Sequence, residues 1–68
     1  MERDPRKDPR PGDVIRSKAG AHRTVEASNQ TSVWYTIYNH ELRCRFGCLL
    51  EEWRIDAKDC EVLHVAGA

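Results

Sequence analysis

Residues 33–46 read VWYTIYNHELRCRF, and this stretch decides the fold. Residues 33–38 are β-branched or aromatic throughout, which is typical of a strand. In residues 41–46 (ELRCRF) apolar and charged side chains alternate strictly, as they do in a strand with one buried face. Asn39 and His40 separate the two runs, and Asn is a favoured first residue of a two-residue hairpin loop. The stretch therefore predicts a β-hairpin.

The alternation also predicts how the two strands pair. A loop of Asn39 and His40 pairs Tyr38 with Glu41, and it keeps the apolar residues of both strands on one face. A slip of one residue would bring arginines onto that face, so the pattern excludes it. A four-residue loop of the same parity keeps the same faces and remains open.

Extending this sheet backward predicts its two faces. A three-residue loop over 29–31 pairs Val25 with Tyr35 and Ala27 with Val33. The expected inner face consists of Val25, Ala27, Val33, Tyr35, Ile37, Leu42, Cys44 and Phe46. The expected outer face consists of His22, Thr24, Glu26, Trp34, Thr36, Tyr38, Glu41, Arg43 and Arg45.

After residue 48 the apolar spacing changes to that of a helix. Leu50, Trp53 and Ala57 are spaced i, i+3, i+7, which places them on one helical face. We expect this face to cover the open end of the inner face, with Trp53 as a core residue. Cys48 stands three residues before Glu51, at the position of the Ser or Thr in a capping box, where cysteine is a poor cap.

The remaining segments complete a small β fold. Residues 14–18 and 22–27 predict strands after the Pro11-Gly12-Asp13 turn, and residues 61–65 predict the last strand. We expect a mostly β fold: a small five-stranded antiparallel barrel or rolled sheet with one short helix before the last strand. The predicted barrel domain is 12–66. Residues 1–11 contain three prolines and no apolar residue after Met1, which predicts a flexible N-terminal arm.

Length and composition narrow the function. With 68 residues there is one domain at most, and no room for a deep catalytic cleft. Lys and Arg number 11, as do Asp and Glu, so the chain lacks the basic excess usual in nucleic-acid binders. We expect no membrane span, because no apolar run approaches the roughly 18 residues that one needs. We expect no secretory signal, because residues 1–12 are charged and lack an apolar segment. Three cysteines without a signal predict a cytoplasmic location.

The order of predicted elements resembles a known class of small barrels. It is similar to Tudor-like or KOW-like barrels, in which a glycine-aspartate turn like that in RPGDVIR (residues 10–16) begins the barrel. The block from VWYTIY to CLLEEWRIDAKDCEVL resembles small uncharacterised proteins of bacteria and their phages. The resemblance covers roughly residues 10–65. It implies binding of a peptide or a nucleic acid, and not catalysis.

The cysteines and histidines raise the possibility of a zinc site. His40, Cys44, Cys48, Cys60 and His64 are all zinc-ligand types. Their spacing contains no C-x2-C knuckle, and the predicted pairing turns Cys44 into the core, where cysteine behaves as a small hydrophobe. We therefore expect no metal and no cofactor. Cys48, near a helix start, is the candidate reactive thiol.

The outer face is the predicted binding surface. Trp34, Tyr38, Arg43, Arg45 and Thr36 are expected to lie together on it, and aromatic residues and Arg are enriched at interface hot spots. The predicted function is a non-enzymatic interaction module, with a phage or prophage accessory protein that binds another protein as the form we favour. The alternative is a single-stranded nucleic-acid-binding barrel that uses Trp34, Tyr38, Arg43 and Arg45.

Overall fold

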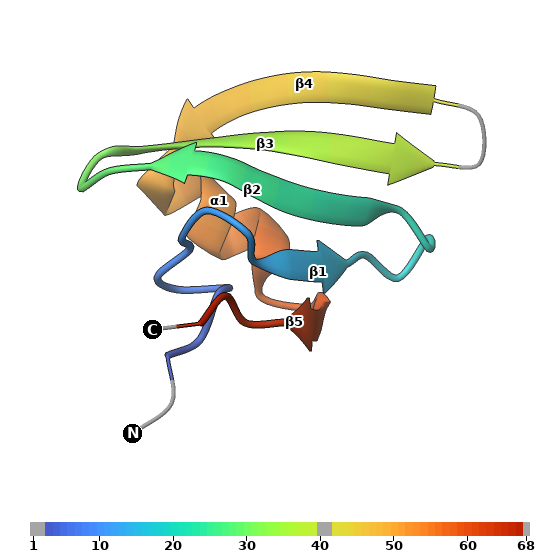
Figure 1. The fold of residues 1–68 in the computed structure, drawn as a ribbon, viewed down its shortest axis with the longest axis horizontal. Coiled ribbons are helices and arrows are strands. Elements are labelled where there is room, and N and C mark those ends of the chain that lie inside the picture. The colour runs from blue at the N-terminus through green and yellow to red at the C-terminus, as the bar shows by residue number, and fades with distance from the viewer. Residues whose placement is uncertain (1–2, 40–41, 68) are drawn as a thin grey trace.

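The computed structural model describes residues 3–39 and 42–67 (Figure 1). These residues form β1 (Val14–Arg16), β2 (His22–Ser28), β3 (Ser32–Asn39), β4 (Leu42–Leu49), α1 (Leu50–Ala57) and β5 (Glu61–His64). The five strands form one antiparallel sheet in the order β4-β3-β2-β1-β5, with the short helix before the last strand, as predicted. Strands β4 and β5 lie at opposite edges, so the sheet is rolled and open; a closed barrel is not formed by the described residues.

The β3–β4 hairpin keeps the predicted faces, and its register is the alternative that the sequence left open, that of the four-residue loop, and not that of the two-residue loop. Asn39 pairs with Leu42 and Tyr38 with Arg43, so each residue of β3 meets a partner two positions further along β4 than in the register of the two-residue loop. A shift of two residues preserves which side chains share a face, because side chains alternate with a period of two. Asn39 belongs to β3, and the predicted loop residue His40 lies outside the described residues, as does Glu41.

Two contacts explain why this register is preferred. Tyr35 pairs with Phe46, and their rings stack with centroids 6.0 Å apart. Trp34 pairs with Gly47, where a Cβ atom would lie only 3.0 Å from Cδ1 of the indole. The register therefore places the large indole opposite the residue without a side chain, and the strand continues through Gly47 to Leu49, three residues beyond its predicted end.

A β-bulge changes the pairing between β2 and β3. Val25 pairs with Tyr35, as predicted, but Ala27 pairs with Trp34 and not with Val33. The extra residue is Glu26, and the bulge turns Ala27 out of the core into solvent, so its predicted inward position is wrong. The Glu26 carboxylate accepts a hydrogen bond of 2.7 Å from Oγ1 of Thr36, which gives a buried hydroxyl its partner.

Helix α1 closes the core from the inner side of the sheet, behind β2 in the view of Figure 1. Trp53 is fully buried, as predicted, and its Nε1 donates a hydrogen bond of 3.0 Å to the carbonyl of Pro5. Its ring meets Tyr35 edge-to-face at 5.0 Å between centroids, which is a favoured arrangement of aromatic pairs. The core consists of Ile15, Val25, Val33, Tyr35, Trp53, Ala57 and Cys60.

Residues 3–11 pack against the domain, in contrast to the predicted flexible arm. Pro5 and Pro9 are buried. The carbonyl of Lys7 accepts a hydrogen bond of 2.8 Å from Nε of Arg54, and the carbonyl of Pro9 accepts one of 2.7 Å from Oγ of Ser28. Backbone carbonyls of this segment thus accept hydrogen bonds from the domain, a kind of contact that amino-acid composition does not reveal.

Asp13 fastens this segment to the end of the chain. Its buried carboxylate accepts hydrogen bonds from the Arg3 guanidinium, from the N–H of Arg10 at 2.7 Å and from the N–H of Ala66 at 2.7 Å. Burial alone would raise the pKa of this carboxyl, but the bonds from these donors outweigh it and lower the pKa. Gly12, at a φ of 95°, makes the turn that presents Asp13 to these donors.

The helix covers only part of the hairpin, and the loop ends of β3 and β4 extend past it (Figure 1). An eight-residue helix is about 12 Å long, whereas an eight-residue strand is about 27 Å long. Leu42, Cys44 and Phe46 were predicted to be buried on the inner face, but all three are exposed, Leu42 by 65% and Phe46 by 47%. Their face is predicted correctly, but their burial is not.

Candidate functional site

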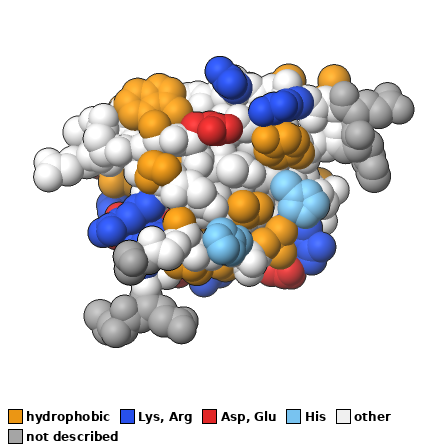
Figure 2. Space-filling model, in the orientation of Figure 1, with side chains coloured by type: hydrophobic (Ala, Val, Ile, Leu, Met, Phe, Trp, Pro, Cys, Tyr) orange, Lys and Arg blue, Asp and Glu red, His pale blue; other side chains and the backbone are white. Residues whose placement is uncertain are grey.

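The outer face of the sheet brings the predicted binding residues together. Tyr38 pairs with Arg43 and Thr36 with Arg45, and Trp34 lies on the same side of β3. The space-filling view shows hydrophobic and basic side chains gathered along one edge of this face, with an acidic side chain among them (Figure 2). Histidine side chains lie lower on the same face (Figure 2).

Arg43 and Tyr38 form a cross-strand pair at one end of this surface. The guanidinium carbon lies 5.4 Å from the centroid of the tyrosine ring, within the range of a cation–π contact. Such a contact is worth about 0.5–1 kcal/mol at an exposed site. It holds the Arg43 side chain against the tyrosine ring on the outer face.

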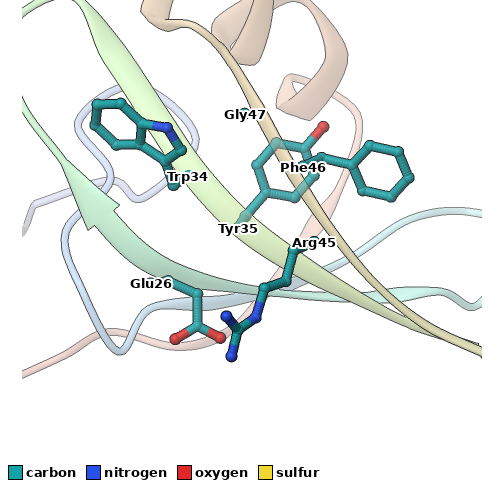
Figure 3. Close-up of a pocket in the computed structure, with 6 residues that line it drawn as sticks. All are labelled: Glu26, Trp34, Tyr35, Arg45, Phe46 and Gly47. Carbon is teal, nitrogen blue, oxygen red and sulfur yellow. The ribbon is translucent and has the colours of Figure 1, made fainter.

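Trp34 forms the wall of a hollow at the other end. The hollow has a volume of about 480 Å³ and is lined by Glu26, Trp34, Tyr35, Arg45, Phe46 and Gly47 (Figure 3). The Glu26 carboxylate and the Arg45 guanidinium lie side by side at one end, away from the indole (Figure 3). Because Gly47 has no side chain, the indole lies close over the strand and is still 45% exposed. The hollow thus joins an apolar wall to charges of both signs.

Thr36 does not contribute to the accessible surface, although it was predicted as a binding residue. Its side chain is fully buried, and its hydroxyl donates to Glu26. The residue therefore fixes the direction of the Glu26 carboxylate at the hollow.

Of the residues that line the hollow, only Trp34 and Arg45 were predicted as site residues; Glu26, Tyr35, Phe46 and Gly47 were not. Glu26 was expected on the outer face but was not predicted as a site residue, because the sequence of residues 22–27 (HRTVEA) does not predict a bulge. Gly47 was left beyond the predicted strand end. A glycine directly after an alternating strand, at the position facing a tryptophan, was the available signal for it.

The cysteines and histidines that the structure describes do not converge on a metal site. Cys60 is buried beneath the helix end, Cys44 is exposed on the uncovered part of the inner face, and His64 pairs with Val14 in the neighbouring strand. His40 lies outside the described residues. Among residues 3–39 and 42–67, no group of three or more metal-ligating side chains is placed to hold an ion.

Cys48 is neither a helix cap nor an activated thiol. It belongs to β4, while the N-cap position is Leu49, which makes no side-chain capping bond. Burial raises the pKa of the Cys48 thiol, and the nearby carboxylates of Glu52 and Asp56 raise it further. The pKa of the predicted candidate for a reactive thiol is therefore raised, which lowers its thiolate fraction.

Arg23 is a charged residue on the inner face that the sequence reasoning did not single out. Its guanidinium lies 5.6 Å from the centroid of the Tyr35 ring. Among the described residues, its buried Nε and Nη1 have no hydrogen-bond partner. Strict alternation in HRTVEA, which places Arg23 on the side of Val25, was the signal for its inward direction.

No family model, curated protein or solved structure matches the chain. The resemblance to Tudor-like or KOW-like barrels therefore stays a prediction from the sequence. In the part of the chain that the structure describes, no helix has the length and apolar character needed to cross a membrane.

Proposed function

We propose that this protein is a non-enzymatic interaction module that binds another protein through the outer face of the β3–β4 hairpin. The observation that carries the proposal is the Trp34 hollow, in which a half-exposed indole is held over Gly47 and the charged groups of Glu26 and Arg45 lie at the other end. An indole fixed in this way loses little side-chain entropy on binding, which favours its use as an anchor.

A protein partner suits the charges of the hollow better than a polyanion does. The Glu26 carboxylate would repel a phosphate group, whereas a protein surface offers charges of both signs to meet Glu26 and Arg45. The formal net charge of zero agrees with this preference. A role as a phage or prophage accessory protein in the cytoplasm belongs to the same proposal and comes from the sequence resemblance and the cysteine content.

Replacement of Trp34 tests the proposal directly. The protein is immobilised, partners are captured from a lysate of the source organism, and the affinity of the recovered partner is measured. We expect Trp34→Ala to weaken binding by at least about 30-fold, which corresponds to a hot spot of about 2 kcal/mol or more. Leu63→Ala, a similarly exposed apolar residue on β5, is the matched control and should leave binding unchanged. Equal affinities for wild type and Trp34→Ala would exclude this site.

Single-stranded nucleic acid is the second candidate partner. It is favoured by one observation: Arg43 is already ordered on Tyr38, close to Arg45, so an aromatic ring and two guanidinium groups lie along one edge of the face. Bases stack on aromatic rings while arginines contact phosphates. If this partner is correct, the affinity for a labelled oligonucleotide should fall steeply with salt, and Arg43→Ala should reduce that dependence. A protein partner would show mild salt dependence and a larger effect of Trp34→Ala than of Arg43→Ala.

A further inference from the structure

Strand β4 presents backbone groups at the edge of the sheet. The N–H of Leu50 donates to the carbonyl of Thr31 at 2.8 Å, which fixes the alternation along the hairpin. Even-numbered residues of β4 point their backbone groups toward β3, so the odd-numbered residues from Arg43 to Leu49 turn theirs outward. β4 is an outermost strand of the sheet formed by the described residues, so these outward groups lack a strand partner there.

The same edge adjoins uncovered apolar surface. Leu42, Cys44 and Phe46 lie on the inner face beyond the reach of α1, and all three are exposed. A long edge strand with apolar side chains beside it is a template for pairing with another strand. Charged residues such as arginine on an edge strand usually oppose such pairing. Pairing therefore requires a register in which Arg43 and Arg45 do not face other arginines.

We propose that β4 pairs with β4 of a second copy of this chain, antiparallel, about a two-fold axis through Phe46. In this register Arg45 faces Gly47 of the other copy, Arg43 faces Leu49, and Cys44 faces Cys48. Each contact occurs twice, as the symmetry of such a dimer requires. Each arginine thus meets an uncharged residue.

Other positions of the axis are less favourable. An axis through Cys44 would place Arg43 directly opposite Arg45 on both sides. An axis through Arg45 would place that residue opposite its own copy. Like charges that face each other across two strands destabilise a sheet. An axis through Gly47 avoids this repulsion, but α1 begins at Leu50, so only residues 45–49 could pair. The axis through Phe46 pairs residues 43–49, the longest register without opposed charges.

This register also places the uncovered end of one hairpin beside the covered end of the other. Leu42 of each copy lies next to Leu50 of its partner, where α1 begins. The two sheets become continuous, and the Arg45 side chain of one copy lies beside the Gly47 and Trp34 of the other on the outer face. This inference does not depend on the identity of any other partner, and it stands or falls separately from the proposed function.

Sedimentation velocity of the full chain over micromolar to millimolar concentrations tests the dimer. We expect a concentration-dependent species of twice the monomer mass. Phe46→Lys, which places two like charges at the axis, should abolish it, whereas Ile55→Lys should not, because Ile55 is 71% exposed on the helix. Leu42→Lys is the second disrupting variant if Phe46→Lys proves unfolded by circular dichroism. A monomer at every concentration, or a dimer that both disrupting variants leave intact, would overturn the proposal.

Disulfide cross-linking tests the register. Cys44 and Cys48 of the other copy form a non-hydrogen-bonded pair, with Cα atoms about 4.5 Å apart, within the range of about 4.4–6.8 Å that a disulfide needs. Diamide serves as the oxidant, taking up the two electrons and two protons that each thiol pair loses. Peptide mass spectrometry should find Cys44 joined to Cys48 between chains, and Ile55→Lys should give the same product. A product joining Cys44 to Cys44 would overturn the proposed axis.

Discussion

The two ends of the β3–β4 hairpin have the same alternation of residues but different surroundings. At the end near α1, Val33 and Tyr35 are buried against the helix. At the end near the loop, Leu42 and Cys44 occupy equivalent inner-face positions and are exposed. The alternation therefore decides the direction of each side chain, while the length of the helix decides whether that side chain is covered. The predictions below test this difference.

Replacement of Trp53 should have the largest effect on stability, because this residue closes the core at the end of the hairpin near α1 (the near end). Trp53→Ala leaves a large cavity and the Pro5 carbonyl without its donor, so we expect a loss of about 3–5 kcal/mol in the free energy of unfolding. Chemical denaturation followed by circular dichroism measures it. A cooperative transition near the wild-type midpoint would show that α1 does not close this core.

Replacement of Asp13 should have the second largest effect on stability, because hydrogen bonds to its carboxylate hold residues 3–10 against the near end of the hairpin. Asp13→Asn leaves the partly buried Arg3 without its charge partner, and we expect a loss of about 3 kcal/mol at neutral pH. A loss below about 0.5 kcal/mol, the usual range for surface substitutions, would contradict the packed N-terminal segment.

The stability of the wild type should also depend on Asp13 as the pH falls. The folded pKa of this carboxyl is lower than its unfolded value of about 3.9, so its stabilising contribution is fully present above that value. The contribution is lost as the pH falls through the folded pKa. Denaturation midpoints of wild type and Asp13→Asn should therefore converge in acid. A constant difference between them down to the lowest pH would argue against this linkage.

The two ends of the hairpin should also differ in thiol reactivity, which is a smaller effect than the losses of stability above. The Cys48 pKa is raised by burial and by nearby carboxylates, whereas Cys44 is exposed near the loop. Since the thiolate is the reactive form, iodoacetamide at neutral pH should alkylate Cys44 before Cys48. Peptide mass spectrometry at successive times gives both rates, and faster modification of Cys48 would mean that the near end is open.

Substitution at the far end should have the smallest effect on the monomer. Leu42 is 65% exposed, so Leu42→Ala should change the free energy of unfolding by no more than about 0.5 kcal/mol at concentrations where the protein is monomeric. A loss of 2 kcal/mol or more would show that the inner face is covered along its whole length.

The sequence predicted the strands, the helix and the faces because alternation and helical spacing are local patterns. Trp53 was correctly placed in the core for the same reason. The features that the sequence did not predict depend on contacts between segments. The register near Trp34 depends on Gly47 in the neighbouring strand, and the exposure of Phe46 depends on where α1 ends. At the bulge, Glu26 accepts a hydrogen bond from the buried hydroxyl of Thr36 on the next strand. No local pattern contains these relations.

For the binding surface, the sequence predicted the shared face of Trp34, Tyr38, Arg43 and Arg45. It could not show the hollow, because the hollow comes from the absence of a side chain at Gly47 and the turn of the backbone at Glu26. It also counted Thr36 as accessible, since a hydroxyl on an outer face is normally solvated. The structure instead uses that hydroxyl to position a carboxylate.

The bonds of the N-terminal segment also bear on how the chain folds during its synthesis. Pro5 accepts from Trp53, and Asp13 accepts from the N–H of Ala66, contacts that span 48 and 53 residues. A domain usually folds as a unit while its chain emerges from the ribosome, and contacts between distant residues form slowly. Here Pro5 and Asp13 leave the ribosome well before their partners Trp53 and Ala66. The hydrogen bonds of the Asp13 carboxylate can be completed only after residue 66 has emerged, so residues 3–13 of the ribosome-bound chain are expected to stay open to proteases until then.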